Sequence, residues 1–380
     1  MKTIKAMKLP VLLLAALLPV ACQQEDTAGS TEQEGLVPLQ LTSGISSSVT
    51  RAFNSSWQAG DVIGVFTTAM GDNTKAVTHS GTYDDANIPY KTEATAETAS
   101  GTAPNYTYTA VSFTAKDDDG KKMIYLPADG SAVDVYAYSP YATGYTAANG
   151  VPVSIPTEQT GVNQKTADLM MASYKSGDGT NSLIYRDNPS VSLQFTHCLS
   201  KVLVRVVVGT GYNDSALDGI SVKITRQPTA AKFDPLQKTA TPLTIDTPVD
   251  FKAISPLDLT GDETAANHDN DFGADYKQFK TIGGTTALKV YRFLLLPNIT
   301  DNPATNPATC NDNEKRQIIF TVGSVTYTHN ISETFEAGQQ TVYTLTLAAT
   351  EVTLTAAITP WATGGTPENT SDPLFPQAIE

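Results

Sequence analysis

Short segments of alternating apolar and polar residues run through this chain, and they constrain its fold more than any other feature. In the first half they occur at Leu36 to Leu41, Asn105 to Thr114 and Val133 to Tyr141, and Asp61 to Thr67 is a short apolar run typical of a buried strand. A period of two residues is what a strand with one buried face requires. Ala167 to Ser173 carries only a hint of a helix, and no segment shows an amphipathic helix of three turns. The sequence therefore predicts an all-β protein of mostly antiparallel strands and loops.

The alternation restarts after a break at residues 186–190, where RDNPS places proline among polar residues. Val191 to Val208 holds enough apolar alternation for two strands. The later strand patterns are ISVKITR, PLTIDT, YRFLLLP, RQIIFTV, VTYTHNI, VYTLTLAAT and EVTLTAAITPW. We therefore expect an N-terminal β-sandwich domain at residues 36–186, a C-terminal one at 187–362, and a polar tail at 363–380.

The composition fits β-sandwich domains and restricts the class of partner. Glycine (26), proline (22) and tyrosine (16) are frequent in the 380 residues, and only 17% of residues are charged. Aromatic and β-branched residues favour strands, while glycine and proline separate them. The formal net charge is −14. Because phosphate groups are bound by basic surfaces, we expect no nucleic-acid partner and no electrostatic attraction to anionic lipid.

Residues 1–21 have the features of a secretory signal peptide. Three lysines lie among the first eight residues, and the apolar run from Leu9 to Val20 ends at the small residue Ala21. This run is shorter than the roughly 20 apolar residues that span a bilayer as a helix. The position of Cys22 resembles the lipobox of bacterial lipoproteins, in which the thiol takes a diacylglycerol. That resemblance implies lipidation at Cys22; the alternative is an ordinary signal peptide followed by a chance cysteine.

Residues 22–35 are then expected to form a lipidated, acidic linker. Its start, Gln23 to Asp26, resembles the export signal that sends lipoproteins of the Bacteroidetes to the outer face of the outer membrane. It is also a polar segment with too little apolar surface to order itself, and the two interpretations are compatible. The resemblance implies a surface-exposed lipoprotein of the cell outer membrane.

The two remaining cysteines leave two alternatives open. Cys198 and Cys310 could form a disulfide in an oxidising compartment or remain as free thiols. Cys198 lies in an apolar strand pattern, whereas Cys310 lies in a polar loop. This mismatch favours the absence of a disulfide.

No catalytic motif is present, so we expect no enzyme, no cofactor and no metal site. The sequence contains no Gly-x-Ser-x-Gly, no phosphate-binding loop and no His-Glu-x-x-His. The four histidines lack ligand spacing, and His197 is expected to be a core or edge residue. The segment from His268 to Asp275 could bind calcium but lacks the spacing of an EF-hand. Trp57 and Trp361 are expected to pack in the core.

Several segments in order resemble one family, the fimbrillins of the Bacteroidetes, whose members are subunits of the type V pilus. They are TRAFNSSWQAGDVIGVF, ADLMMAS, FTHCLSKVLVRV, FEAGQQTVYTLTL and ITPW, and the resemblance covers about residues 36 to 362. It implies two transthyretin-like antiparallel β-sandwich domains in series. It also implies a major or minor subunit of a surface fimbria.

The resemblance implies an assembly mechanism. A protease that cuts after arginine, here between Arg51 and Ala52, would remove the lipidated end and the first strand. The strand lost on cleavage would be that of Leu36, Val37, Leu39 and Leu41. A strand from another pilin subunit would then enter the open groove by β-strand addition. The alternative for Arg51 is an ordinary solvated loop arginine.

Two functions are carried forward. The first is a fimbrial structural or adhesive subunit, more consistent with a tip or accessory position than with the shaft, because Pro373 and Pro376 would each remove a ladder donor from a C-terminal donor strand. The second is a surface glycan-binding lipoprotein, suggested by tyrosines at positions 136, 138, 141 and 145. Alternation places Tyr136 and Tyr138 on one face of a strand, where we expect them to pack.

Overall fold

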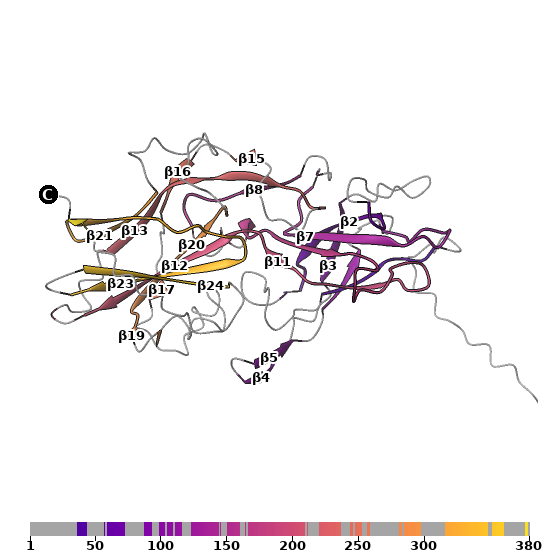
Figure 1. Cartoon of the computed structure of the whole chain (residues 1–380), viewed down its shortest axis with the longest axis horizontal. Coiled ribbons are helices and arrows are strands. Elements are labelled where there is room, and N and C mark those ends of the chain that lie inside the picture. The colour runs from indigo at the N-terminus through magenta and orange to yellow at the C-terminus, as the bar shows by residue number, and fades with distance from the viewer. Residues whose placement is uncertain are drawn as a thin grey trace, which may run out of the picture. The chain divides into compact units, whose positions relative to one another are not determined.

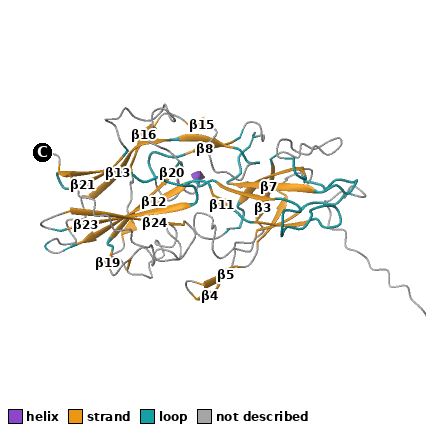
Figure 2. Cartoon of the chain, in the orientation of Figure 1, coloured by secondary structure: helices purple, strands orange, loops and turns teal. Residues whose placement is uncertain are grey.

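Strands and loops make up nearly all of the residues that the computed structural model describes, as Figure 1 and Figure 2 show, with a few helical residues near position 166. This confirms the all-β prediction. The structure describes residues 36–43, 57, 59–72, 87–92, 99–102, 105–108, 111–115, 123–143, 145, 150–159, 164, 166–209, 211, 220–236, 244–245, 248–252, 257–258, 281–282, 285–297, 316–348, 352–360 and 377–378. In this part of the chain, no helix has the length and apolar character needed to cross a bilayer.

The N-terminal half is built on an eight-stranded sheet in the order β10-β1-β6-β3-β2-β7-β9-β11. The strands are β1 Gln40–Ser43, β2 Val62–Ala69, β3 Ile88–Thr92, β6 Val111–Ala115, β7 Val133–Ser139, β9 Met170–Tyr174, β10 Ser190–Leu193 and β11 Thr196–His197. The terminal strands β10 and β11 follow each other directly in the chain, and β10 also lies beside β9. The sheet therefore curls back on itself and encloses an apolar core.

The C-terminal half contains two five-stranded sheets. One has the order β17 Leu257–Asp258, β20 Lys289–Leu295, β12 Ser200–Val208, β23 Gln339–Leu347 and β24 Val352–Pro360. The other has the order β16 Pro248–Lys252, β13 Ile220–Pro228, β21 Gln317–Val322, β22 Val325–Asn330 and β25 Gln377–Ala378. Val202 and Val204 of β12 share one core with Ile224 of β13 and Phe320 of β21. Side chains from both sheets thus form the common interior expected of sheet-on-sheet packing.

Three smaller units complete the described strands. β8 Val151–Ser154, β14 Ala230–Phe233 and β15 Thr244–Ile245 form a three-stranded sheet. Two hairpins pair β4 Ala99–Thr102 with β5 Asn105–Tyr108, and β18 Thr281–Ile282 with β19 Thr285–Thr286. Because β14 pairs with β8, residues 151–154 add a strand to a segment from the C-terminal half.

The sheets do not part at the boundary expected near residues 186–190. β10 and β11 follow that boundary, yet they pair with β1 and β9 of the N-terminal sheet. The physical reason is burial: Leu193 and Phe195 lie in the same core as Leu41. Proline at position 189 interrupts the alternation without ending the domain, so residues up to His197 belong to the first sheet.

Other local expectations need correction. The alternating run at residues 105–114 is two strands in different sheets, β5 and β6. Residues 170–173, within the segment that hinted at a helix, lie in strand β9. Most of the described strand pairs are antiparallel, as expected, but β1 pairs in parallel with β10 and β12 in parallel with β23. Each of these parallel partners is far away in sequence, so local alternation carries no sign of the pairing.

Gly64, in the middle of β2, makes room for a buried polar cluster. A Cβ at this position would lie 2.2 Å from Cε1 of Tyr138 and 2.5 Å from Oδ1 of Asn87. The Tyr138 hydroxyl lies 2.6 Å from that same Oδ1, and the Asn87 amide donates to the carbonyl of Ala142 at 2.9 Å. Burial raises the pKa of Tyr138 to about 12. Asn87 has a φ of 62°, a left-handed conformation that asparagine tolerates well.

Replacing Gly64 with alanine is expected to destabilise the protein by about 2–3 kcal/mol, because the buried ring of Tyr138 has no room to move. Urea unfolding of Gly64→Ala against the wild type measures this change. Gly130→Ala is the matched control: its φ is +80° and nothing lies within 4 Å of a new Cβ, so only the backbone preference of about 1 kcal/mol is lost. Equal losses for the two variants would contradict the close packing of Gly64.

Candidate functional site: the first strand and its slot

The first described segment, residues 36–43, lies inside the N-terminal sheet between two other strands. β1 pairs in parallel with β10, Gln40 opposite Ser190 and Ser43 opposite Leu193, and antiparallel with β6. Just before β1, the amide of Leu39 donates to the carbonyl of Ile124 at 2.9 Å. The amide of Leu126 donates to the carbonyl of Val37 at 2.8 Å. The segment therefore satisfies main-chain groups of neighbours on both sides.

Its side chains alternate between the core and the surface. Leu39, Leu41 and Ser43 are buried, with exposed fractions of 4%, 2% and 0%, whereas Gln40 is exposed and Thr42 is intermediate. Burying a leucine side chain contributes about 1.5–3 kcal/mol relative to leaving it in water. Four residues were expected to form the displaced strand. The structure places Leu39 and Leu41 of these in the core and packs half-buried Val37 against it; Leu36 is half-buried.

Trp57 lies in this core, beside Ser43, the last residue of β1. Its indole ring is 2% exposed and makes edge contacts with Phe113 of β6, at a centroid distance of 5.2 Å, and with Phe195, at 5.0 Å. The indole N–H donates to the Ser43 hydroxyl at 2.9 Å. The expectation that Trp57 packs in the core is confirmed. The hydrogen bond to Ser43 was not predicted, because nothing in the spacing of the two residues indicates it.

The two walls of the β1 slot are held by contacts that do not involve β1. β6 also pairs with β3, Thr92 opposite Phe113. β10 continues through Phe195, which lies in the core, into β11, which pairs with β9. Loss of β1 would therefore leave two supported strands with unpaired main-chain groups facing each other. Such a pair of strand edges is suited to receive another strand.

Several residues singled out from the sequence lie outside the described residues. They are the lipidation and cleavage positions Cys22, Arg51 and Ala52, together with Cys310, Trp361 and the segment 268–275. Cys198 is a free, buried cysteine, and burial raises the pKa of its thiol. His197 is buried, and its Nδ1 lies 2.9 Å from Oδ1 of Asp168, which agrees with a core histidine. Among the described residues, no group of three or more His, Cys, Asp or Glu could hold a metal ion.

The tyrosines that suggested glycan binding divide into two groups. Tyr136 and Tyr138 are both 0% exposed, so their rings offer no face to a sugar. Tyr141 and Tyr145 are half-buried. The packing of Tyr136 and Tyr138 confirms the expectation from alternation and removes the main observation behind the glycan-binding alternative.

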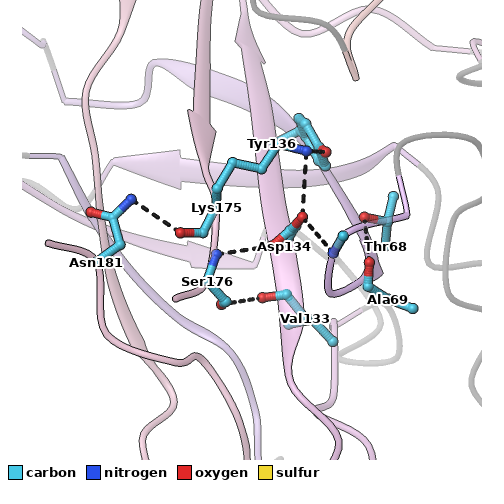
Figure 3. Close-up of polar contacts among 9 residues, drawn as sticks. Thr68, Ala69, Val133, Asp134, Tyr136, Lys175, Ser176 and Asn181 are labelled. Carbon is cyan, nitrogen blue, oxygen red and sulfur yellow. Dashed lines mark hydrogen bonds and ion pairs between the residues drawn. The ribbon is translucent and has the colours of Figure 1, made fainter. Parts of the chain in front are cut away.

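A polar cluster around Asp134 of β7 connects neighbouring segments of the N-terminal sheet (Figure 3). The carboxylate is 1% exposed and accepts from the amides of Gly71, at 3.1 Å, and Ser176, at 2.8 Å. Lys175 reaches the carboxylate at 3.4 Å and donates to the Tyr136 hydroxyl. Burial alone would lower the pKa of Lys175, but the hydrogen bond to Tyr136 and the charge of Asp134 raise it above its ordinary value. The cluster joins the turn after β2 to the segment after β9.

If β1 is integral to the sheet, removing its largest inward side chain should destabilise the whole domain. We expect Leu41→Ala to lower the free energy of unfolding by about 2–5 kcal/mol. The neighbouring Gln40→Ala is the control, because Gln40 is exposed, and its effect should stay within about 0.5 kcal/mol. Urea unfolding followed by tryptophan fluorescence, to which Trp57 and Trp361 both contribute, measures both effects. Similar small effects would show that β1 contributes little to the fold.

Comparison with known proteins agrees with this architecture. The fimbrillin-like family model matches residues 50–361. A protein from Bacteroides uniformis, provisionally named fimbrium subunit Fim1C, is 34% identical over 227 residues, which are 58% of this chain and 62% of that protein. The chain thus spans less than two thirds of the length of this relative.

Solved structures with the same fold come from provisionally assigned cell adhesion proteins. One from Bacteroides uniformis has a TM-score of 0.56 at 22% identity and covers 87% of this chain and 99% of its own. One from Bacteroides ovatus has a TM-score of 0.55 at 18% identity and covers 86% and 98%. Because the family model takes in most of the 380 residues, the chain belongs to the fimbrillin-like family.

Proposed function

We propose that this protein is a structural or adhesive subunit of a surface fimbria, joined to other pilin subunits by replacement of β1. Family membership supports a fimbrial role, since the fimbrillin-like model covers residues 50–361. The observation that carries the assembly step is the interior position of β1. A strand paired on both sides cannot be released without opening a slot, and the slot can be closed again only by another strand.

The connection after β1 supplies the means of release. Ser43 ends the strand, Trp57 is the next described residue, and Arg51 lies between them in the sequence. A cut between Arg51 and Ala52 by an arginine-specific protease would separate β1 from the rest of the chain while leaving Trp57 in place. β1 would then be held only by hydrogen bonds and packing, so a strand of another subunit could displace it.

The route to the cell surface forms part of the same proposal. Residues 1–21 act as the signal peptide and Cys22 carries the lipid, which anchors the chain in the cell outer membrane until processing. The acidic linker directs it to the outer face. After cleavage the lipid remains with the removed segment, and the processed subunit enters the fimbrium. We propose that its two halves are transthyretin-like β-sandwich domains in series, and the common core of the two C-terminal sheets supports this.

We further propose a tip or accessory position. A shaft subunit must both accept a strand and donate one. The tail from residue 363 onward contains Pro373 and Pro376, each of which lacks the amide that a ladder needs. Gln377–Ala378 already pairs with β22 at the edge of a sheet. Both features favour a subunit that accepts a strand without donating one.

The N-terminal sequence and intact mass of the protein on its native cells test the assembly step. We expect a mature chain that begins at Ala52 and forms multimers resistant to detergent. Arg51→Ala should abolish trimming, leave the lipidated chain starting at Cys22, and remove the multimers. Immunoblots of surface fractions would follow these species.

Arg186→Ala is the matched control for this experiment. Arg186 lies outside the connection between Ser43 and Trp57, and its guanidinium donates to the carbonyl of Ala128 at 2.9 Å. Its loss should leave trimming and multimers unchanged. Multimers that form from untrimmed Arg51→Ala protein would refute release of β1 by cleavage at this site.

A further inference from the structure

The last residue of β1 places a polar side chain in the core, unlike the leucines before it. Leu39 and Leu41 present apolar side chains, but the next inward residue, Ser43, presents a hydroxyl. Ser43 is 0% exposed and lies opposite Val111 on one side and Leu193 on the other. Its oxygen accepts the indole N–H of Trp57 at 2.9 Å, within the buried interior. A small polar side chain therefore occupies an otherwise apolar end of the slot.

Trp57 is held so that its N–H keeps this direction. Phe113 meets the indole at an interplanar angle of 88° and Phe195 at 73°, both edge-on, and the ring is 2% exposed. Reorienting the ring would disturb the packing of two phenylalanines in a dense core. Phe113 belongs to β6, a wall of the slot, and Trp57 lies after Arg51 in the chain. Both aromatic residues therefore stay with the subunit when β1 leaves.

We propose, on the basis of the strand replacement described above, that Trp57 is a specificity-determining residue that selects the incoming strand. A strand that places an aliphatic residue at the position of Ser43 would remove the acceptor of a buried N–H, which is unfavourable. A large residue would overlap the packed aromatic rings. The preferred partner is an extended segment of another subunit with apolar residues at two alternate positions and serine at the next, the pattern of Leu39, Leu41 and Ser43 in this chain.

Peptide exchange on the full-length protein tests this selection. A site-specific protease sequence placed at residues 48–51 allows β1 to be cut from the rest of the chain without other change. Fluorescent peptides covering residues 36–43 then compete for the slot, and anisotropy gives their affinities. We expect the peptide with Ser43→Ala to bind about tenfold more weakly than the native peptide. The peptide with Gln40→Ala, altered at an exposed position, should bind as the native one does.

The Trp57→Phe chain identifies the cause of the discrimination. Phenylalanine keeps an aromatic ring between Phe113 and Phe195 but has no N–H, so the native and Ser43→Ala peptides should bind within about twofold of each other. Discrimination that survives in Trp57→Phe, or its absence in the wild-type chain, would overturn the selection by Trp57 while leaving strand replacement intact. Failure of every peptide to displace β1 would refute strand replacement itself, and the selection with it.

A double-mutant cycle in the uncut protein measures the same coupling without peptide exchange. Ser43→Ala, Trp57→Phe and the double variant are compared by urea unfolding. Ser43→Ala should lower the folding equilibrium constant about tenfold with tryptophan at position 57 and about twofold with phenylalanine. Equal effects in the two backgrounds would show that the hydrogen bond does not couple the two residues.

Discussion

The pairing of β1 on both of its sides is the constraint on which the N-terminal sheet depends. A first strand at the edge of a sheet would leave the main-chain groups on one of its sides unpaired. Here the segment from Val37 to Ser43 joins β6 and residues 124–126 to β10, and its leucines complete the core beside Trp57. Without it, two strand edges and an apolar groove would face solvent, a combination that promotes association with other chains. In the proposed assembly, the segment thus covers these groups until a strand of another subunit replaces it.

The sequence predicted the elements better than their partners. Apolar runs and period-two alternation located β2, β7, β20 and β23, because each buries at least one face in a continuous core. It failed where pairing depends on residues far away in the chain. β1 and β10 pair in the fold, where Leu41 and Leu193 lie in the same core. In the sequence, β10 looked like the start of a new domain after Pro189. Gly64 could be noted in a strand pattern, but its reason, the ring of Tyr138, appears only in the fold.

At the candidate site, too, the sequence predicted the strand but not its long-range contact. The resemblance to fimbrillins implied that Leu39 and Leu41 belong to a strand that is lost on cleavage, and the alternation alone already predicted a strand there. Ser43 and its hydrogen bond to Trp57 had no counterpart in the sequence pattern, since a serine at the end of an apolar strand usually marks a turn. Polar contacts between residues 14 apart in a chain depend on how the intervening segment is routed, and local composition does not specify that route.

In the proposed exchange, the apolar contacts of Leu39 and Leu41 and the hydrogen bond of Ser43 would contribute differently to recognition of a strand. Leu39 and Leu41 contribute apolar burial, which is large but tolerates many aliphatic side chains, so it favours binding of almost any alternating strand. A buried hydrogen bond contributes less net free energy, yet its loss is costly when the donor stays behind without its acceptor. In the proposed exchange, Trp57 belongs to the receiving subunit and Ser43 to the departing strand, so this asymmetry would act when one strand replaces the other. Affinity would then come from the leucine positions, and discrimination between strands from the serine position.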